Sequence, residues 1–274
     1  MLISTFFDHI VSGARQRGIS LSEAARLCLE AGVSGVEFLS HQYNDESLCC
    51  LRELKQAGMC VNGYPAFTDL IHDPSEAAVE EAVRRAAGLG ARGILLVPGF
   101  LNPGEEPVPA MERSLPMVEQ ACRRAREEGM FVGMEDYDSE HSPVCGSEGL
   151  LWYLERVPAL DCIFDTGNFY YMGEDTLSAY RRLRSRITRQ VHLKDRSLAP
   201  RPCEKCFRRP DGSYMYPCAV GEGNMPIGEI LADLADAGFD GSLTVELFGH
   251  PDCIGGVSES VRFIRKYFPE AGRM

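Results

Sequence analysis

Residues 242–249 read SLTVELFG, a short β-prone apolar run that reaches a glutamate, Glu246, and then a glycine. Three earlier runs repeat this pattern with an acidic or imidazole side chain near the end. They are FVGMEDY with Glu135, CIFDTGNF with Asp165 and QVHLKD with His192. A charge inside an apolar strand costs free energy unless it is paired or bound to a metal. At the carboxyl end of a barrel strand, the same side chain can face a pocket.

Eight β-prone runs alternate with runs of helical period along the whole chain. The predicted strands span residues 2–7, 35–39, 60–67, 93–97, 131–137, 162–169, 189–195 and 242–248. The predicted helices span residues 20–31, 44–57, 74–89, 109–128, 147–156, 175–185, 226–237 and 256–267. Parallel strands need crossover helices, and such helices need a sheet to cover. The alternation therefore predicts an α/β fold in which residues 1–274 form a single (β/α)8 TIM barrel domain.

An open, doubly wound sheet is the structural alternative, and the glycine pattern argues against it. Such a sheet normally carries a phosphate-binding glycine turn after its first strand, where this chain reads DHIVSGARQRG. A GxGxxG match does occur at Gly88, Gly90 and Gly93, but it precedes a predicted strand instead of following one. We interpret these glycines as the end of a helix and the turn into the fourth strand.

The longest irregular stretch, about residues 197–224, follows the seventh predicted strand. Barrel enzymes keep their chemistry on that face, and loops of this length are usually functional. We therefore expect a lid or a substrate-contacting insertion there. Three cysteines lie in it or at its edge: Cys203, Cys206 and Cys218. A structural zinc site needs four ligands, so a zinc site, a disulfide and an ordinary loop all stay open.

Composition limits the classes of partner. The formal net charge is −12, which disfavours nucleic acid because phosphate backbones bind basic faces. No apolar run reaches the roughly 18 residues of a membrane span, and the first residues do not resemble a signal peptide. The eleven cysteines are then expected to be reduced thiols in a cytoplasmic protein that acts on a small molecule.

The four charged or imidazole side chains belong to predicted strands five to eight, whose carboxyl ends meet on one face of a barrel. Any one of them could be a structural ion pair or a satisfied core group. All four together favour a shared metal site of Glu135, Asp165, His192 and Glu246. Three carboxylates and one imidazole suit Mn2+, Mg2+ or Co2+ and can accept Zn2+.

Short motifs in a fixed order complete the pattern and carry a family resemblance. They are GVEF at 35–38, FDTGN at 164–168, HLKD at 192–195, VGEG at 220–223 and VELFG at 245–249. The chain resembles the sugar phosphate isomerase/epimerase family, which has the xylose isomerase-like barrel, and within it the ketose 3-epimerases.

The resemblance implies one divalent metal ion, most often Mn2+, held by Glu135, Asp165, His192 and Glu246. It implies that Glu135 and Glu246 form the catalytic acid/base pair and remove a proton next to a carbonyl through an enediolate. The outcome is then epimerisation or aldose–ketose isomerisation of a sugar or sugar phosphate. Members of the family are often dimers or tetramers, so the resemblance is also compatible with a homo-oligomer.

Two positions depart from the epimerase pattern. Asn168 stands where those enzymes often have histidine, and His141 stands where they have a substrate-binding glutamate. We regard both as candidate substrate contacts, together with Lys194, Arg196 and Glu37. For Lys194 an ion pair with Asp165 or Asp195 is the plainer alternative, and for Glu37 a position on the polar rim.

Three other functions compete with the isomerase. A dehydratase of the inosose or dehydroshikimate type would use the same metal and the same proton abstraction, then expel a hydroxyl. An apurinic endonuclease would need more histidines than the six present, and a histidine at Asn168. A non-catalytic barrel would be expected to have lost members of the ligand set.

Overall fold

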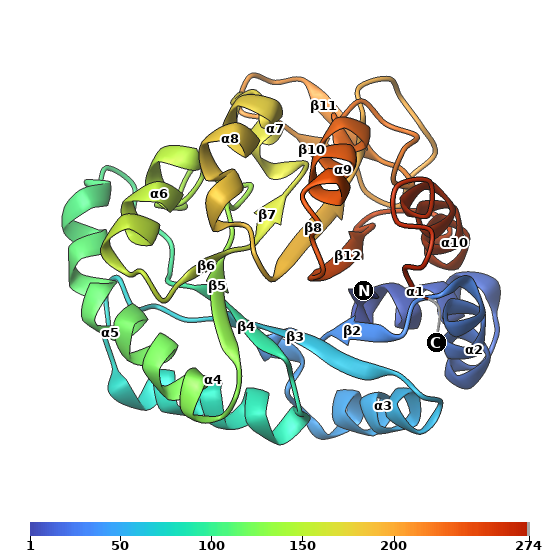
Figure 1. Ribbon diagram of the computed structural model, residues 1–274, viewed down its shortest axis with the longest axis horizontal. Coiled ribbons are helices and arrows are strands. Elements are labelled where there is room, and N and C mark those ends of the chain that lie inside the picture. Colours follow the sequence, from blue (N-terminus) through green and yellow to red (C-terminus); the bar gives the residue numbers. More distant parts are fainter. Residues whose placement is uncertain (273–274) are drawn as a thin grey trace.

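Parallel strands form a ring at the centre of the computed structural model, which describes residues 1–272 (Figure 1). Around the ring, in order, these strands are β6 (Asp161–Cys162), β5 (Phe131–Met134), β4 (Gly93–Val97), β3 (Cys60–Phe67), β2 (Gly35–Glu37), β1 (Leu2–Phe6), β12 (Ser242–Glu246), β8 (Gln190–Lys194) and β7 (Phe164–Asp165). Only Ile163 separates β6 from β7, so the two are parts of one interrupted strand that pairs with β5 and with β8. The ring is thereby closed, and the predicted TIM barrel is confirmed.

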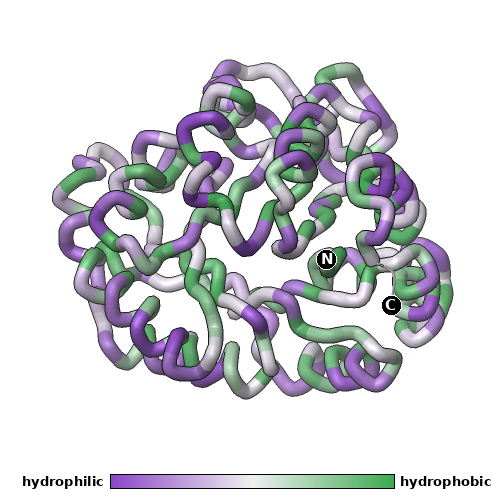
Figure 2. Tube along the Cα trace, in the orientation of Figure 1, coloured by the Kyte–Doolittle hydropathy of each residue, from purple (hydrophilic) through white to green (hydrophobic). Residues whose placement is uncertain are grey.

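Helices surround the ring (Figure 1). They are α1 (Phe7–Arg17), α2 (Leu21–Ala31), α3 (Asp45–Gln56), α4 (Glu76–Leu89), α5 (Pro107–Glu127), α6 (Ser147–Arg156), α7 (Asn168–Tyr171), α8 (Thr176–Leu183), α9 (Ile227–Asp236) and α10 (Cys253–Ile264), with 3-10 turns at Ser40–Gln42 and Arg184–Arg186. Apolar and polar residues interleave along them, so each helix has one face for the sheet and one for water (Figure 2). None within residues 1–272 is long and apolar enough to cross a bilayer.

Local capping explains where several helices begin and end. Ser20 caps α2, since its side chain accepts the backbone N–H of Glu23. Ser75 caps α4, so this helix begins at Glu76, two residues later than the predicted start at residue 74. The same helix ends at Gly90, whose φ of 70° is left-handed, as the interpretation of the glycine pattern required.

The structure differs from the sequence predictions in one additional helix and in the end of one strand. Helix α1 follows β1 directly, although no helix was predicted before residue 20. The predicted strand 162–169 ends at Asp165, because the Asp165 carboxylate accepts the N–H groups of Gly167 and Asn168. Those two hydrogen bonds turn the chain into α7, so Asn168 opens a short helix at the rim of the barrel.

Strand register places the candidate ligands at one level. Asp165 is paired with His192 across β7 and β8, and Glu246 is paired with Lys194 across β12 and β8. Glu135 comes one residue after β5 ends. The carboxyl ends of these neighbouring strands therefore bring charged side chains together, as a parallel barrel requires.

The opposite, amino end of the barrel also holds polar side chains, but they are neutral and bond to one another. The Ser4 hydroxyl lies 2.8 Å from that of Thr244, and the Asn62 amide donates to Ser4 at 3.0 Å and to Ser242 at 3.2 Å. All four are buried. This neutral layer is a structural network, and the Gln190 amide joins it to the carboxyl end by donating to the Thr244 hydroxyl at 3.1 Å.

The segment after β8, which we call the insertion (residues 196–224), is more regular than predicted. It contains a small antiparallel sheet of β9 (Arg196–Ser197), β10 (Phe207–Arg208) and β11 (Tyr214–Pro217). The two outer strands are only two residues long, too short for periodicity to reveal. Asp195 fixes its base, since its carboxylate accepts the backbone N–H groups of Gly221, Gly223 and Met225.

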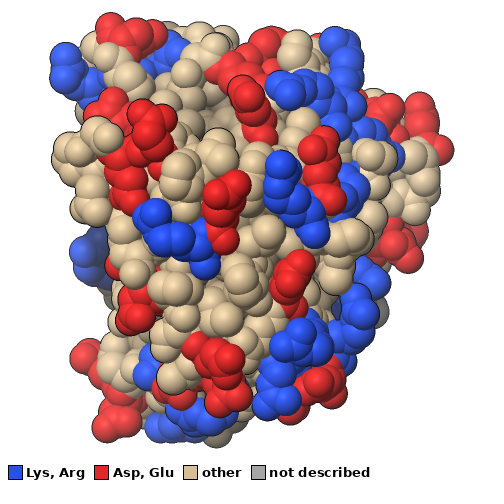
Figure 3. Space-filling view, turned by 90° about the vertical axis from the view of Figure 1, so that its left-hand side faces the viewer, with Lys and Arg blue, Asp and Glu red and all other residues tan. Residues whose placement is uncertain are grey.

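Surface charge is mixed: acidic and basic side chains interleave over the face drawn in Figure 3. All eleven cysteines are free thiols. Cys203 and Cys206 are partly exposed while Cys218 is buried, and no disulfide joins them. The metal-capable group found in residues 1–272 contains none of these cysteines, so of the three alternatives left open the structure favours an ordinary loop.

Candidate metal centre and active site

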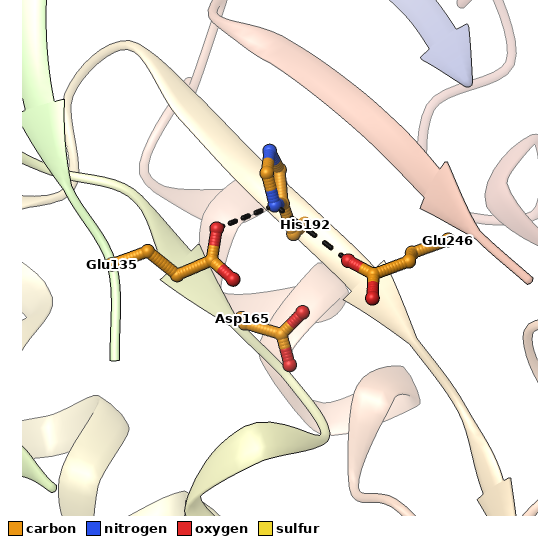
Figure 4. A group of neighbouring side chains, drawn as sticks. All are labelled: Glu135, Asp165, His192 and Glu246. Atoms are coloured by element: carbon orange, nitrogen blue, oxygen red, sulfur yellow. Dashed lines mark ion pairs between the residues drawn. The ribbon is translucent and has the colours of Figure 1, made fainter. Parts of the chain in front are cut away.

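Four side chains from four neighbouring strands point at one another at the carboxyl end of the barrel (Figure 4). They are Glu135, Asp165, His192 and Glu246, and one candidate ligand atom from each lies within 4.8 Å of all the others. All four are buried, with at most 8% of their surface exposed. The structure therefore brings together the four side chains that the sequence singled out.

Asp165 is oriented by its own backbone. Its Oδ1 accepts the N–H groups of Gly167 at 2.7 Å and of Asn168 at 2.8 Å, which leaves Oδ2 to face the group. Oδ2 has no hydrogen-bond partner. One oxygen thus holds the carboxylate in place while the other is free to bind.

His192 is oriented from behind by a carboxylate. Its Nε2 lies 3.0 Å from Oε1 of Glu37, and the Gln190 amide donates to the same oxygen. A proton on Nε2 leaves the Nδ1 lone pair directed at the group. This carboxylate–imidazole arrangement is the one that typically supports a metal-ligating histidine.

Glu135 and Glu246 approach His192 from opposite sides (Figure 4). The Oε2 atoms of the two glutamates lie 2.6 Å and 3.8 Å from Nδ1 of His192. Their other oxygens are engaged: Glu135 accepts from the Asn168 amide at 3.0 Å, and Glu246 lies 2.6 Å from the Lys194 ammonium. Each glutamate therefore presents one oxygen to the shared centre.

Buried atoms without partners mark that centre. Oε2 of Glu135, Oδ2 of Asp165 and Nδ1 of His192 are all buried, and none makes a hydrogen bond. The first and third are only 2.6 Å apart and still lack hydrogen-bond geometry. A buried polar atom without a hydrogen bond costs about 1–3 kcal/mol. Ion pairs between Glu135 and His192 and between Asp165 and Lys194 leave this hydrogen-bonding capacity unused, so three such atoms at one point favour a common ligand. Three carboxylates and an imidazole fit a divalent cation.

Electrostatics agree with that fit. Burial raises the pKa of Asp165 to about 8, with the neighbouring glutamates adding to the effect and Lys194 opposing it. Burial also raises the pKa of Glu135, although His192 opposes the shift. Burial disfavours a charged His192, but the carboxylates of Glu135 and Glu37 outweigh it and raise its pKa. Negative charge is in excess here, and a bound cation would relieve it.

Lys194 lies beside the ligand group and not apart from it. Its ammonium is 2.6 Å from Glu246 and 3.6 Å from Asp165, and it donates to the side-chain oxygen of Asn168. Burial opposes its charge, but nearby carboxylates, Asp138 and Asp165 foremost, raise its pKa. The ion pair with Asp165, the plainer of the two sequence interpretations, is present, and the side chain also faces the cavity.

A cavity of about 500 Å³ opens onto the group. Its walls come from the barrel rim, from aromatic side chains and from the insertion, and they include Glu135, Asn168, Lys194, Glu246, Phe6, Phe67, Tyr137, Phe248, Arg196, Lys205 and Phe207. Of the predicted substrate contacts, Asn168, Lys194 and Arg196 line it. Glu37 lies behind His192 instead, and His141 is an exposed surface residue outside the lining.

Sequence reasoning overlooked several residues of this region. Gln190 supports Glu37, and its position two residues before His192 in a strand places both on one face. Asp136 is fully buried with both carboxylate oxygens unpartnered, and the acidic run EDYD was the available signal. Lys205 and Phe207 line the cavity from the insertion, and no local sequence pattern predicts this position.

A family model described as xylose isomerase-like TIM barrel matches residues 25–267. The chain belongs to that family, as the sequence motifs implied. The match covers the barrel from α2 to beyond α10, and so includes all four members of the metal-capable group.

Curated relatives point to epimerases. The chain is 28% identical over 152 residues to fructoselysine 3-epimerase of Escherichia coli O157:H7, an alignment covering 54% of this chain. The chain spans about half the length of the curated relatives it matches, 49% in this case. Similarity to an epimerase supports an isomerase-type enzyme at low identity.

Solved structures share the fold over nearly the whole chain. The IOLI protein with a bound zinc atom has a TM-score of 0.72 at 17% identity and covers 98% of this chain and 99% of its own. The probable 3-DHS dehydratase AsbF of Bacillus anthracis has a TM-score of 0.69 at 20% identity, covering 96% and 98%. At such identities these likenesses establish the fold alone.

Proposed function

We propose that this protein is a divalent-metal-dependent isomerase that abstracts a proton next to the carbonyl of a sugar or sugar phosphate. One observation carries the proposal: three buried, unpartnered ligand atoms converge with a fourth carboxylate at the carboxyl end of the barrel. The similarity to a fructoselysine 3-epimerase supports epimerisation as the outcome.

Glu135, Asp165, His192 and Glu246 would hold the cation. A divalent ion there would polarise a ketone oxygen and stabilise the negative charge that develops when the neighbouring carbon loses its proton. Oxygen ligands in the majority favour Mn2+ or Mg2+, with Co2+ and Zn2+ also tolerated. We propose Mn2+ as the working metal.

Glu135 and Glu246 are the proposed acid/base pair. They approach the centre from opposite sides of His192, so a substrate carbon between them would meet one carboxylate on each face (Figure 4). One glutamate takes the proton and the other returns one to the opposite face, which inverts the stereocentre. Lys194, 2.6 Å from Glu246, holds that carboxylate in position beside the centre.

Asp165 and His192 are proposed to act as ligands only. Asp165 is held by two backbone N–H groups and His192 by Glu37, so neither has the freedom to follow a moving proton. The cavity of about 500 Å³ suits a small molecule, with aromatic walls for the carbon skeleton of a sugar. Eleven free thiols are compatible with the cytoplasm, which is the location that we propose.

A dehydratase is the second candidate, because the barrel is similar to that of the probable dehydratase AsbF. It would use the same metal group and the same proton abstraction, then expel a β-hydroxyl with protonation of the leaving oxygen. The two candidates differ in their products: an isomer retains the mass of the substrate, whereas dehydration removes one water.

Deuterium exchange tests both candidates at once. The Mn2+-loaded protein is incubated in D2O with ketoses, ketose phosphates and inososes, and NMR follows deuterium at the carbon beside the carbonyl. Glu246→Gln, at saturating Mn2+, is compared with Glu229→Gln, which changes an exposed helical glutamate.

We expect exchange in the wild type and in Glu229→Gln, and its collapse in Glu246→Gln. Loss of a general base typically lowers the reaction rate by about 100- to 10,000-fold. Product mass then separates isomerase from dehydratase. An absence of exchange with every compound, in protein that holds its metal, would contradict the proposed chemistry.

A further inference from the structure

Arg196 is a buried guanidinium without a counter-charge. It is the first residue of β9, lines the cavity and is only 1% exposed. Its Nη1 has no hydrogen-bond partner, and no ion pair of its side chain is found in residues 1–272. Its guanidinium lies over the ring of Phe207, whose centroid is 4.3 Å away.

Nearby acidic groups are already engaged. Asp195 precedes Arg196 in the chain, but its carboxylate accepts backbone N–H groups at the base of the insertion. Glu246 is paired with Lys194. His9 cannot supply negative charge, and burial, followed by nearby cations that include Arg196, lowers its pKa to about 3 and keeps it neutral. A buried cation left alone in this way is expensive unless a ligand pairs with it.

The insertion adds a second cation and is seated firmly on the barrel rim. Lys205 lines the same cavity, with its ammonium 5.4 Å from the ring centre of Phe207. The backbone N–H groups of Glu204 and Lys205 both donate to the carbonyl of Gly249, three residues after Glu246. Gly249 has a φ of 85°, and a Cβ there would lie 2.4 Å from the Lys205 carbonyl oxygen. The loop and the rim therefore fit only with glycine at this position.

The cavity thus has two chemically different walls. One carries the carboxylates of Glu135 and Glu246 from the metal-capable group, and the other carries Arg196, Lys205 and the ring of Phe207. A neutral sugar would leave the second wall unpaired. A guanidinium fork matches the two oxygens of a carboxylate or phosphate better than it matches a hydroxyl.

We propose that Arg196, assisted by Lys205, is an oxyanion subsite, so that the substrate is a polyhydroxy ketone that also carries a carboxylate or phosphate. The inference rests on the proposed function, since it names the substrate class of the same cavity. Phe207 is a positioning residue, because its ring packs against the guanidinium and fixes the plane of the fork.

Calorimetric titration of the Mn2+-loaded protein tests the subsite with three probes of one skeleton: fructose, fructose 6-phosphate and fructuronate, the corresponding ketose carboxylate. Arg196→Gln is compared with Arg208→Gln, which removes an exposed arginine of the same insertion that does not line the cavity. Thermal unfolding of each variant verifies folding, and Phe207→Leu serves as a second variant that leaves the charge in place.

We expect at least one anionic probe to bind roughly 10- to 100-fold more tightly than fructose, the value of one charge-assisted contact. Arg196→Gln should abolish that preference, Phe207→Leu should weaken it, and Arg208→Gln should leave it intact. The probe that gains more identifies the oxyanion as phosphate or carboxylate.

Equal binding of all three probes by the wild type, no measurable binding of either anionic probe, or a preference that survives Arg196→Gln would overturn the subsite. Deuterium exchange is scored separately. An anion preference that depends on Arg196 without exchange would leave the subsite standing and refute the chemistry. Exchange with ketoses in a wild-type protein that shows no preference for the anionic probes would do the reverse.

Discussion

The two ends of the barrel bury polar side chains in different ways. At the amino end, Ser4, Asn62, Ser242 and Thr244 are neutral, and their side chains hydrogen-bond to one another. At the carboxyl end, the four members of the metal-capable group are charged or imidazole, and three of them direct an unpartnered atom at a common centre. Both layers are equally hidden from water.

Burial therefore does not distinguish a site from a scaffold, whereas unused hydrogen-bonding capacity does. A satisfied network stabilises the fold, and a buried group with orphaned atoms lowers stability until something binds. If this distinction holds, changes at the carboxyl end should alter metal binding more than stability, and changes at the amino end should do the opposite.

The largest effect is expected for His192→Gln, which removes the imidazole ligand. Changing a residue that supports a metal ligand typically lowers metal affinity about 10- to 100-fold. We therefore expect loss of the ligand itself to lower Mn2+ affinity by more than about 100-fold. Equilibrium dialysis with Mn2+ measures the change. Denaturant unfolding of the metal-free variant should show little loss of stability, and a large loss with unchanged affinity would reverse the comparison.

Metal affinity should rise with pH. The metal-free fold raises the pKa of Asp165 from 3.8 to about 8, and raises that of His192 above 6.5. The folded protein then holds protons that the unfolded chain releases, so metal-free stability falls as pH rises from about 4 toward 8.

Binding of the cation must expel those protons, so affinity should increase up to about tenfold per pH unit for each proton released. Titration calorimetry from about pH 6 to pH 8, in buffers of different ionisation enthalpy, counts the protons. An affinity independent of pH would show that the ligands are already deprotonated.

Glu37→Gln should have a smaller effect on the same site. It keeps the shape of the side chain that supports His192 but removes its charge, which weakens the imidazole as a ligand. We expect Mn2+ affinity to fall about tenfold, with Glu155→Gln, an exposed glutamate of α6, as the matched control. If Glu37 were instead a substrate contact, as the sequence suggested, ligand affinity would fall and metal affinity would not.

The smallest effect on the site is expected for Asn62→Ala at the amino end. The change removes the two hydrogen bonds that the Asn62 amide donates to Ser4 and Ser242, so the free energy of unfolding should drop by about 1–3 kcal/mol. Urea denaturation measures this loss. Mn2+ affinity should stay at the wild-type value, and a change in affinity would mean that the two layers are not independent.

The barrel could be predicted because each apolar run and each helical period is a local pattern. The four candidate ligands could be singled out because they end separate strands, and closure of a parallel ring puts such ends on one face. Gly90 likewise indicated the end of a helix, because glycine readily adopts the left-handed conformation found there.

Other features depend on contacts that no local pattern records. Asp165 ended its strand early because its carboxylate captured two backbone N–H groups. The positions of Lys205 and Phe207 depend on the seat of the insertion on Gly249, about forty residues away in the chain, which packing alone determines. Glu37 was expected to face the substrate, and only the tertiary structure places it behind His192.

The most direct test of the central claim is the amount of metal bound. The protein is stripped with chelator, dialysed against Mn2+ and analysed by elemental mass spectrometry, with Asp165→Asn alongside. We predict one tightly held ion per chain in the wild type and a large loss in the variant. A wild-type protein that folds and holds no ion, or an Asp165→Asn variant that holds it equally well, would contradict this prediction.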